Sequence, residues 1–372
     1  MAETSGRRGI ESCVKPQVAQ LRPYSPGKPI SEVQRELGLT DVIKLASNEN
    51  PFGPAPRVVE AIRAALPELA LYPDAGAVEL RTKLAGQLGV TIDHLSMGNG
   101  SDELLQLIGY AVLDEGDELV IGDPTFARYE PQATLNRARA VKVPLRDMTH
   151  DVEALAAACG PRTKAIFLAN PHNPAGTFNP DAEVEWLCDN VPEHVLVVLD
   201  EAYYEFVDQP DHGRSQAIAL ARPNVLILRT FSKVHALAAL RVGYALARPE
   251  LIRWIEQVRE PFNVNSLAQV AALAALDDTE HVTMALAANA SGRERLYAGC
   301  AQLGLRTVPS QANFVLIEVG EREAALYQGL LRRGVIVRGC TPLGFPGYLR
   351  ITVGTPEQVE RCLEALGAAL GD

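Results

Sequence analysis

The residues with the clearest chemical potential lie in one short stretch after a strand-like, mostly apolar run at positions 225–229. Thr230, Ser232 and Lys233 follow that run, and Arg241 comes eight residues after the lysine. Hydroxyls and a guanidinium are good phosphate ligands. Positive charge nearby lowers the pKa of a lysine and frees its amine to act as a nucleophile. The stretch predicts a lysine that forms a Schiff base with a phosphate-bearing aldehyde, although alone it fits a solvated surface lysine equally well.

Other polar side chains stand at the ends of apolar runs at 118–121, 164–168 and 195–199. Short apolar runs separated by helical patterns predict βα units and a mostly parallel sheet that is buried on both faces. Ligands of such sheets bind beyond the carboxyl ends of the strands. We therefore expect one edge of the sheet to gather the following side chains: Phe126, Asn173, Asp200 and Tyr203.

A glycine-rich turn leads into a helical pattern at residues 104–113. Gly100 opens the turn, and Ser101 or Asp102 can cap the helix. Free backbone N–H groups and the positive end of the helix dipole make such a turn a ready phosphate site. A plain capped helix is the other interpretation. The turn does not match the dinucleotide-binding pattern Gly-x-Gly-x-x-Gly, because Glu103 stands at the position of the third glycine.

Together these groups suit one cofactor. Asp200 can pair with a protonated pyridine nitrogen, while Asn173 and Tyr203 can hydrogen-bond the phenolic oxygen beside the aldehyde. Phe126 can stack on the ring, and Lys233 can form the imine. Phosphate ligands would come from Gly100, Ser101, Asp102, Thr230, Ser232 and Arg241. An aspartate and a lysine around a pyridine ring are the signature of pyridoxal phosphate sites, with Lys233, Asp200 and Tyr203 as the catalytic candidates.

Composition excludes several classes of partner. The chain has 372 residues, is 47% hydrophobic, and carries a net charge of -11 without a basic run, which argues against nucleic acid and anionic membranes. Its six cysteines are scattered without metal-ligand spacing, so we expect a reducing compartment and no metal site. Residues 1–11 are polar, and no apolar run approaches the ~20 residues that span a bilayer. These features predict a cytoplasmic protein.

The order of elements predicts an α/β fold with three parts. Residues 1–50 would form an N-terminal arm and a segment of the small domain, including a helix at 31–37 with Ser31 as its N-cap. Residues 51–262 would form the large cofactor-binding domain. Residues 263–372 would form a smaller α+β domain with strands at 314–317, 335–337 and 348–353.

An ordered set of motifs resembles the histidinol-phosphate aminotransferase family of fold-type-I pyridoxal phosphate enzymes over roughly residues 15–370. The motifs are Leu45-Ala-Ser-Asn-Glu-Asn-Pro-Phe-Gly-Pro, Gly98-Asn-Gly-Ser-Asp-Glu, Asn170-Pro-His-Asn-Pro-Ala-Gly-Thr, Asp200-Glu-Ala-Tyr, Thr230-Phe-Ser-Lys, Leu240-Arg-Val-Gly-Tyr, Pro261-Phe-Asn-Val-Asn-Ser and Leu349-Arg-Ile-Thr-Val-Gly-Thr. The resemblance implies a seven-stranded, mostly parallel sheet sandwiched by helices, and a homodimer with shared active sites.

The resemblance also implies functional roles for residues whose local sequence alone does not indicate one. Tyr72 matches a tyrosine that reaches the phosphate of the neighbouring subunit's cofactor; otherwise it is a turn residue that packs on the core. Tyr24 and Asn48 match substrate-side positions. Arg350 matches the arginine that binds the substrate's anionic group, and its place in an apolar strand also calls for a ligand or partner. Arg338 matches a second, phosphate-side arginine, against the alternative of a surface arginine.

One segment departs from the family pattern. His235 stands where an aromatic residue is common, and Ala236 and Ala239 replace glycines, so extra methyl groups enter a tight backbone approach. We expect His235 to pack in the core; the alternative is that it tunes proton transfer.

The predicted activity is ping-pong transamination between histidinol phosphate and 2-oxoglutarate through the Lys233 Schiff base, in histidine biosynthesis. Alternatives are an aromatic (phenylalanine or tyrosine) aminotransferase, or a pyridoxal phosphate enzyme of another reaction type, such as a decarboxylase or cyclase. A non-catalytic ligand sensor is disfavoured, since no DNA-binding helix-turn-helix or basic patch accompanies the site.

Overall fold

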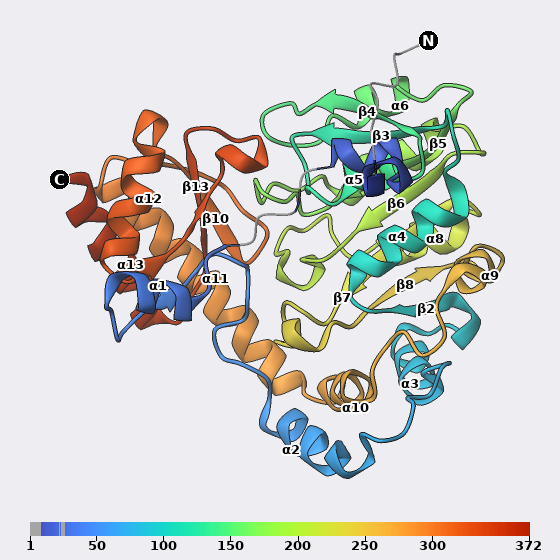
Figure 1. Ribbon diagram of the computed structural model, residues 1–372, viewed down its shortest axis with the longest axis horizontal. Helices are drawn as coiled ribbons and strands as arrows, with labels where there is room; N and C mark the ends of the chain where they lie inside the picture. Colours follow the sequence, from blue (N-terminus) through green and yellow to red (C-terminus); the bar gives the residue numbers. More distant parts are fainter. Residues whose placement is uncertain (1–8, 22, 24–26) are drawn as a thin grey trace.

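A seven-stranded sheet forms the centre of the computed structural model, which describes residues 9–21, 23 and 27–372 (Figure 1). Its strand order is β2-β8-β7-β6-β5-β3-β4, and only β8 runs antiparallel to its neighbours. The strands are β2 Leu95–Gly98, β3 Glu118–Asp123, β4 Arg139–Pro144, β5 Thr163–Ala169, β6 Leu196–Asp200, β7 Val225–Thr230 and β8 Gly243–Ala247. The predicted α/β fold with a mostly parallel sheet is confirmed.

Both faces of the central part of this sheet are buried, which explains why β5, β6 and β7 are mostly apolar. On β7, Val225 and Ile227 enter one core cluster, while Leu226 and Leu228 enter the cluster on the opposite face. This alternation follows from the two-residue period of a strand. The first face is covered by α2 Pro56–Ala65, α3 Val78–Leu88, α6 Val152–Ala157, α7 Asp181–Asn190, α8 Ser215–Ala221 and α10 Ser266–Ala275. The second is covered by α4 Ser101–Val112, α5 Tyr129–Leu135 and α9 Pro249–Val258.

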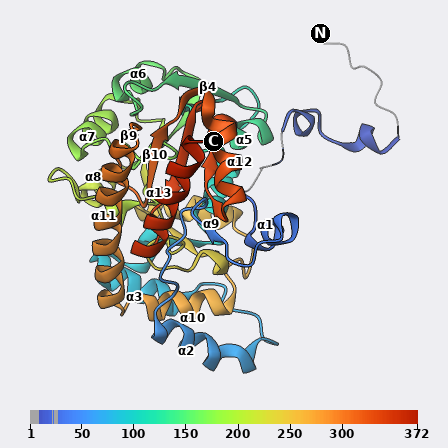
Figure 2. The same cartoon turned by 90° about the vertical axis from the view of Figure 1, so that its left-hand side faces the viewer.

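A smaller unit carries its own sheets and core. Its four-stranded antiparallel sheet has the order β12-β13-β10-β9, and a two-stranded parallel sheet pairs β1 with β11. The strands are β1 Ile43–Lys44, β9 Arg306–Val308, β10 Phe314–Glu318, β11 Val335–Ile336, β12 Arg338–Gly339 and β13 Tyr348–Thr352. The helices are α1 Ile30–Leu37, α11 Thr279–Gln302, α12 Glu323–Arg332 and α13 Pro356–Leu370; Figure 2 looks onto the last three. Because β1 pairs with β11, residues 43–44 join this unit; the domain limits at 50 and 262 stay predictions.

Helix starts differ from the sequence prediction in two places. α1 begins at Ile30 with Pro29 as N-cap, so Ser31 is not the cap; the fixed φ of proline already sets the extended geometry that precedes a helix. α4 begins at Ser101 with Gly100 as N-cap, so neither Ser101 nor Asp102 caps it. Gly100 has φ 77°, and a Cβ there would lie 2.5 Å from the Arg241 guanidinium, so only glycine fits.

The prediction also missed or merged strands. β2 and β4 were not predicted. The strand predicted at 335–337 is shorter, since β11 ends at Ile336, and β12 of the other sheet begins at Arg338. β4 lies at an edge of the sheet, where Arg139, Lys142 and Pro144 replace the apolar residues of a central strand. Among the described residues, no helix is long and apolar enough to cross a membrane.

Candidate active site

The carboxyl ends of β5, β6 and β7 open into a pocket of about 270 Å³ that residues of the small unit also line. Lys233 and Asp200, which the sequence predicts to bind the same cofactor, both line this pocket. The pocket also brings together these other predicted site residues: Asn48, Ser101, Asp102, Phe126, Asn173, Tyr203, Thr230, Ser232, Arg241, Arg338 and Arg350. Side chains that lie far apart in sequence therefore share one space.

Two of the predicted site residues that the structure describes do not line the pocket. Gly100 lies directly before Ser101, with its backbone against Arg241. Tyr72 is 82% exposed and stacks on Phe262 with ring centroids 4.7 Å apart, so it does not reach the pocket of its own chain. Tyr24 lies outside the described residues.

Asp200 is 5% exposed at the end of β6. The Tyr129 hydroxyl donates to its Oδ2 at 2.7 Å, whereas Oδ1 has no hydrogen-bond partner among the described residues. Burial raises the pKa of Asp200 to about 6, and the Tyr129 hydrogen bond opposes that rise. A buried carboxylate oxygen without a donor is costly, and a protonated pyridine nitrogen would satisfy it. Sequence reasoning missed Tyr129, although its position three residues after Phe126 was a signal.

A hydrogen-bonded cluster joins the sheet to the small unit beside Asp200. The Tyr203 hydroxyl accepts from Asn48 Nδ2 at 2.8 Å and from Asn173 Nδ2 at 3.4 Å. Arg350, which is nearly buried, donates to Asn173 Oδ1 at 2.6 Å and to the Ala46 carbonyl at 3.1 Å. Burial raises the pKa of Tyr203, while the Arg350 charge opposes this. These contacts hold Asn173 and Tyr203 as hydrogen-bonding groups and orient the Arg350 guanidinium.

A second cluster has the chemistry of a phosphate site. Thr230 Oγ1 donates to Ser232 Oγ at 3.0 Å, and Arg241 Nη1 donates to the same oxygen at 3.4 Å. The start of α4 lies against β8, because a Cβ on Gly243 would be 2.8 Å from the backbone nitrogen of Ser101. Arg241 Nη2 also lies 3.5 Å from Asp102 Oδ2. Hydroxyls, a guanidinium and a helix N-terminus thus converge, as phosphate binding requires.

Lys233 lies between these clusters. Its Nζ donates to the Ser47 carbonyl at 3.4 Å and lies 5.5 Å from the centre of the Tyr203 ring. His235 does not line the pocket: it packs against Phe231 with ring centroids 5.0 Å apart, and burial lowers its pKa to about 4. This packing agrees with the expectation that His235 belongs to the core. Ala236, one of the glycine replacements, has the left-handed φ of 58°.

Fold and pocket define a class of protein: a pyridoxal phosphate enzyme of fold type I, built on a mostly parallel sheet with lysine and aspartate at its carboxyl edge. The partnerless Asp200 Oδ1 and the hydroxyl–arginine cluster fit the ring nitrogen and the phosphate of this cofactor.

Comparisons with known proteins narrow the class. Residues 40–366 match the family described as aminotransferase class I and II. Histidinol-phosphate aminotransferase of Moorella thermoacetica is 48% identical over 94% of this chain and 91% of its own length. The enzyme of the same name from Geobacillus sp. is also 48% identical, over 95% of this chain and 97% of its own.

Solved structures give the same answer. Histidinol-phosphate aminotransferase of Sinorhizobium meliloti, in complex with pyridoxal-5'-phosphate, aligns with a TM-score of 0.89 at 30% identity and covers 99% of both chains. Aspartate aminotransferase of Thermus thermophilus with maleate aligns at 0.83 and 27% identity, over 98% of this chain and 100% of its own. The chain belongs to the class I and II aminotransferase family, in the group of the histidinol-phosphate aminotransferases. The predicted family, fold and pyridoxal phosphate cofactor are confirmed.

Proposed function

We propose that this aminotransferase moves the amino group of histidinol phosphate to 2-oxoglutarate, as a step of histidine biosynthesis. Relatives that carry the name histidinol-phosphate aminotransferase are 44–48% identical over nearly the whole chain. The observation that carries the proposal is that two arginines from the small unit, Arg338 and Arg350, line the same pocket as Lys233. A donor with a phosphate and an acceptor with carboxylates both require such cations.

The cofactor would be held by groups of this chain. The amine of Lys233 would attach it covalently, and the carboxylate of Asp200 would accept from its ring nitrogen. Asn173 and Tyr203 would hydrogen-bond its phenolic oxygen, and Phe126 would stack on the ring. The phosphate ligands would be Gly100, Ser101, Asp102, Thr230, Ser232 and Arg241, with Tyr72 of the partner subunit. Bound pyridoxal phosphate supplies an electron sink for charge that develops on the substrate's α-carbon.

The remaining chemistry is proton transfer and anion binding. Lys233, once released by the incoming amine, would take the proton from the α-carbon as general base and return it as general acid. Arg350 would bind the anionic end of either substrate, the phosphate of the donor or a carboxylate of the acceptor, because its orientation is already fixed by Asn173 and the Ala46 carbonyl. Arg338 would bind the donor's phosphate, with Asn48 and Tyr24 on the substrate side. Since one pocket serves two substrates in turn, the kinetics should be ping-pong.

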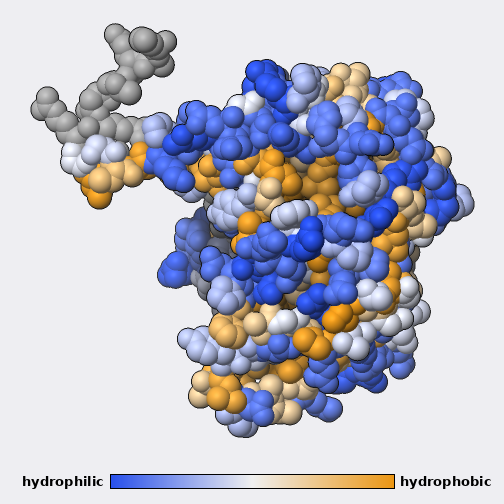
Figure 3. Space-filling model, turned by 90° about the vertical axis from the view of Figure 1, so that its right-hand side faces the viewer, coloured by the Kyte–Doolittle hydropathy of each residue, from blue (hydrophilic) through white to orange (hydrophobic). Residues whose placement is uncertain are grey.

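We further propose a homodimer that shares its active sites. Support comes from the connection between α2 and α3, where Leu69, Leu71 and Tyr72 are more than half exposed beside Phe262. Figure 3 shows apolar surface among polar residues on the face that carries α3 and α9. Large exposed apolar side chains at one place mark an interaction surface. The six free cysteines further support a cytoplasmic, reducing location.

A half-reaction screen tests the substrate. Each candidate donor is mixed with the cofactor-loaded enzyme without any acceptor, and the loss of the lysine-bound cofactor band is followed. We expect histidinol phosphate to react with a kcat/KM at least about tenfold above that of phenylalanine or tyrosine, because only it can use both arginines. A preference for phenylalanine or tyrosine would make the protein an aromatic aminotransferase instead. Product that forms without a keto acid acceptor would indicate another reaction type.

A further inference from the structure

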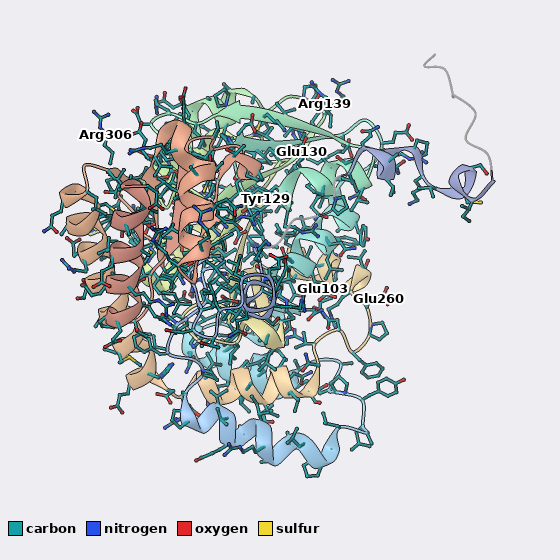
Figure 4. The ribbon with its side chains drawn as sticks, turned by 60° about the vertical axis from the view of Figure 1, so that its left-hand side comes forward. Glu103, Tyr129, Glu130, Arg139, Glu260 and Arg306 are labelled. Atoms are coloured by element: carbon teal, nitrogen blue, oxygen red, sulfur yellow. The ribbon has the colours of Figure 1, made fainter. Side chains whose placement is uncertain are left out.

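Two of the sequence motifs contain residues that the pocket does not use. Glu103 ends the glycine-rich motif, and Asn263 lies in the segment that follows α9. Their side chains meet: Glu103 Oε2 accepts from Asn263 Nδ2 at 2.7 Å and from the backbone nitrogen of Asn99 at 2.6 Å. Figure 4 labels Glu103 at the start of α4 and Glu260 on the adjoining segment. Neither Glu103 nor Asn263 lines the pocket.

Asn263 is itself held at three points. Its Nδ2 also donates to the Met97 carbonyl of β2 at 3.0 Å, and its Oδ1 accepts from Arg259 Nη1 at 2.9 Å. Arg259 pairs with Glu256 of α9 at 2.9 Å, and Glu256 accepts from Ser96 of β2. The amide therefore stands on a network anchored in a strand and a helix of the large sheet, which gives it one orientation.

This network binds the turn at residues 98–100, which leads into α4 and positions the first N–H groups of that helix. Gly100 donates its backbone N–H to the Gly98 carbonyl at 2.8 Å, and the preceding N–H, that of Asn99, is bound by Glu103. With those two N–H groups engaged, the chain enters α4 at Ser101 with its free N–H groups directed out of the helix end.

We propose that Glu103 and Asn263 form a clamp that positions residues 98–102 for the cofactor phosphate. Both are positioning residues, since neither touches the pocket. The inference rests on the proposed role of this turn as a phosphate site.

The charge of Glu103 allows a sharp distinction. An anion close to a phosphate site weakens phosphate binding electrostatically, so a pure charge effect predicts tighter binding when the carboxylate is removed. A clamp predicts weaker phosphate binding for the alanine variant, because Asn99 and Asn263 then lose their hydrogen bonds to Glu103. Glutamine removes the charge but keeps an oxygen that can accept both hydrogen bonds.

The experiment measures the dissociation constant of pyridoxal phosphate from the apoenzyme by equilibrium titration, together with the thermal midpoint of each apo variant. We expect E103A and N263A each to raise the dissociation constant about tenfold, in line with the loss of hydrogen bonds to a charged group. E103Q should stay within about twofold of the wild type, and N263D should exceed N263A because two carboxylates then face each other. The double variant E103A/N263A should resemble either single variant, since each single change already removes the hydrogen bond between Glu103 and Asn263.

Q106A provides the matched control. Gln106 lies on the same helix, one turn further on, and donates to the exposed Tyr110. Its dissociation constant should equal that of the wild type. The proposal is overturned if E103A binds the cofactor as tightly as the wild type or more tightly, if E103Q is as weak as E103A, or if the variants lower only the thermal midpoint. If the wild type binds pyridoxal phosphate but does not react with histidinol phosphate, the proposed substrate fails while the clamp is still tested.

Discussion

The two halves of the pocket are built in different ways. The cofactor half comes from one sheet: Asp200 ends β6, and Thr230 ends β7. The substrate half is assembled from separate segments, with Asn48 after β1 and Arg338 and Arg350 on β12 and β13. Three hydrogen-bonded contacts described above join the halves: Asn48 with Tyr203, Arg350 with Asn173, and Lys233 with the Ser47 carbonyl. The cofactor can therefore be kept by a fixed strand edge while substrate choice changes through the packing of the smaller unit.

The strongest test of the cofactor half is Lys233→Ala. Loss of the amine removes both the covalent attachment and the proton carrier, so we expect kcat to fall by at least about 10³-fold and the visible lysine-bound band to vanish. Absorbance spectra and steady-state rates check this. Lys164→Ala is the control, because Lys164 lies on β5 outside the pocket and pairs with Asp117. An unchanged band in Lys233→Ala would remove the lysine from the mechanism.

Asp200→Asn should have the next largest effect. Removing one partner of a buried ion pair costs about 3–5 kcal/mol, so cofactor affinity should fall by roughly 10²–10⁴-fold. Because the pKa of Asp200 is raised to about 6, the wild-type apoenzyme should bind pyridoxal phosphate best above that pH and more weakly below it. Titrations between pH 5 and pH 8 (roughly the range around this pKa) check the step. Asp200→Asn should not show this change of cofactor affinity with pH. If the variant kept the same pH dependence, another group would be responsible for it.

The same carboxyl has a stability signature with a definite sign. Its pKa is raised from 3.8 to about 6 in the folded apoprotein, so its contribution to folding is full below the lower value and is lost as the pH rises through the higher one. We expect the wild type to lose stability relative to Asp200→Asn over that window. Urea unfolding of both apoproteins at several pH values checks this, and an opposite slope of the difference would contradict it.

The substrate half is tested by comparing Arg350→Ala with Arg338→Ala. Arg350→Ala should raise KM for both substrates by about 10²-fold, since it also frees Asn173, whereas Arg338→Ala should raise KM about tenfold for the phosphate donor only. Initial rates with each substrate varied in turn check the difference. Arg332→Ala, at the exposed end of α12, is the control. If both variants affected the two substrates equally, the two arginines would not have separate roles.

The smallest effect is expected where the chain departs from the family pattern. Ala236 has φ 58°, a conformation that costs an L-residue roughly 1 kcal/mol, so Ala236→Gly should raise the thermal midpoint of the apoprotein by about 2 °C. Ala239 lies in a short 3₁₀ turn, Ala238–Leu240, without a positive φ, so Ala239→Gly should lower the midpoint slightly. Calorimetry on the pair checks the contrast. Equal changes would mean that strain at Ala236 is absent.

The same contrast explains what the sequence could predict. Strand-end residues such as Asp200 and Lys233 were identifiable, because a buried parallel sheet brings the ends of its strands to one edge. Tyr129 was missed, since its contact with Asp200 depends on how α5 packs against the sheet. The meeting of Glu103 with Asn263 was missed for the same reason: 160 positions separate them in the chain. Ser31 and the edge strand β4 were misjudged because local propensity is weak where proline or exposure decides.

The position of β8 has a consequence for synthesis. In the seven-stranded sheet β2 is an edge strand that pairs with β8 alone, and the backbone of Gly243 in β8 supports the start of α4. While residues 113–242 are being translated, the nascent chain already contains Gly98 and Ser101. It still lacks β8, the strand against which they pack. We therefore expect vitamin B6 capture to follow release of the later strand from the exit tunnel, so a chain that terminates before residue 243 should emerge without its coenzyme.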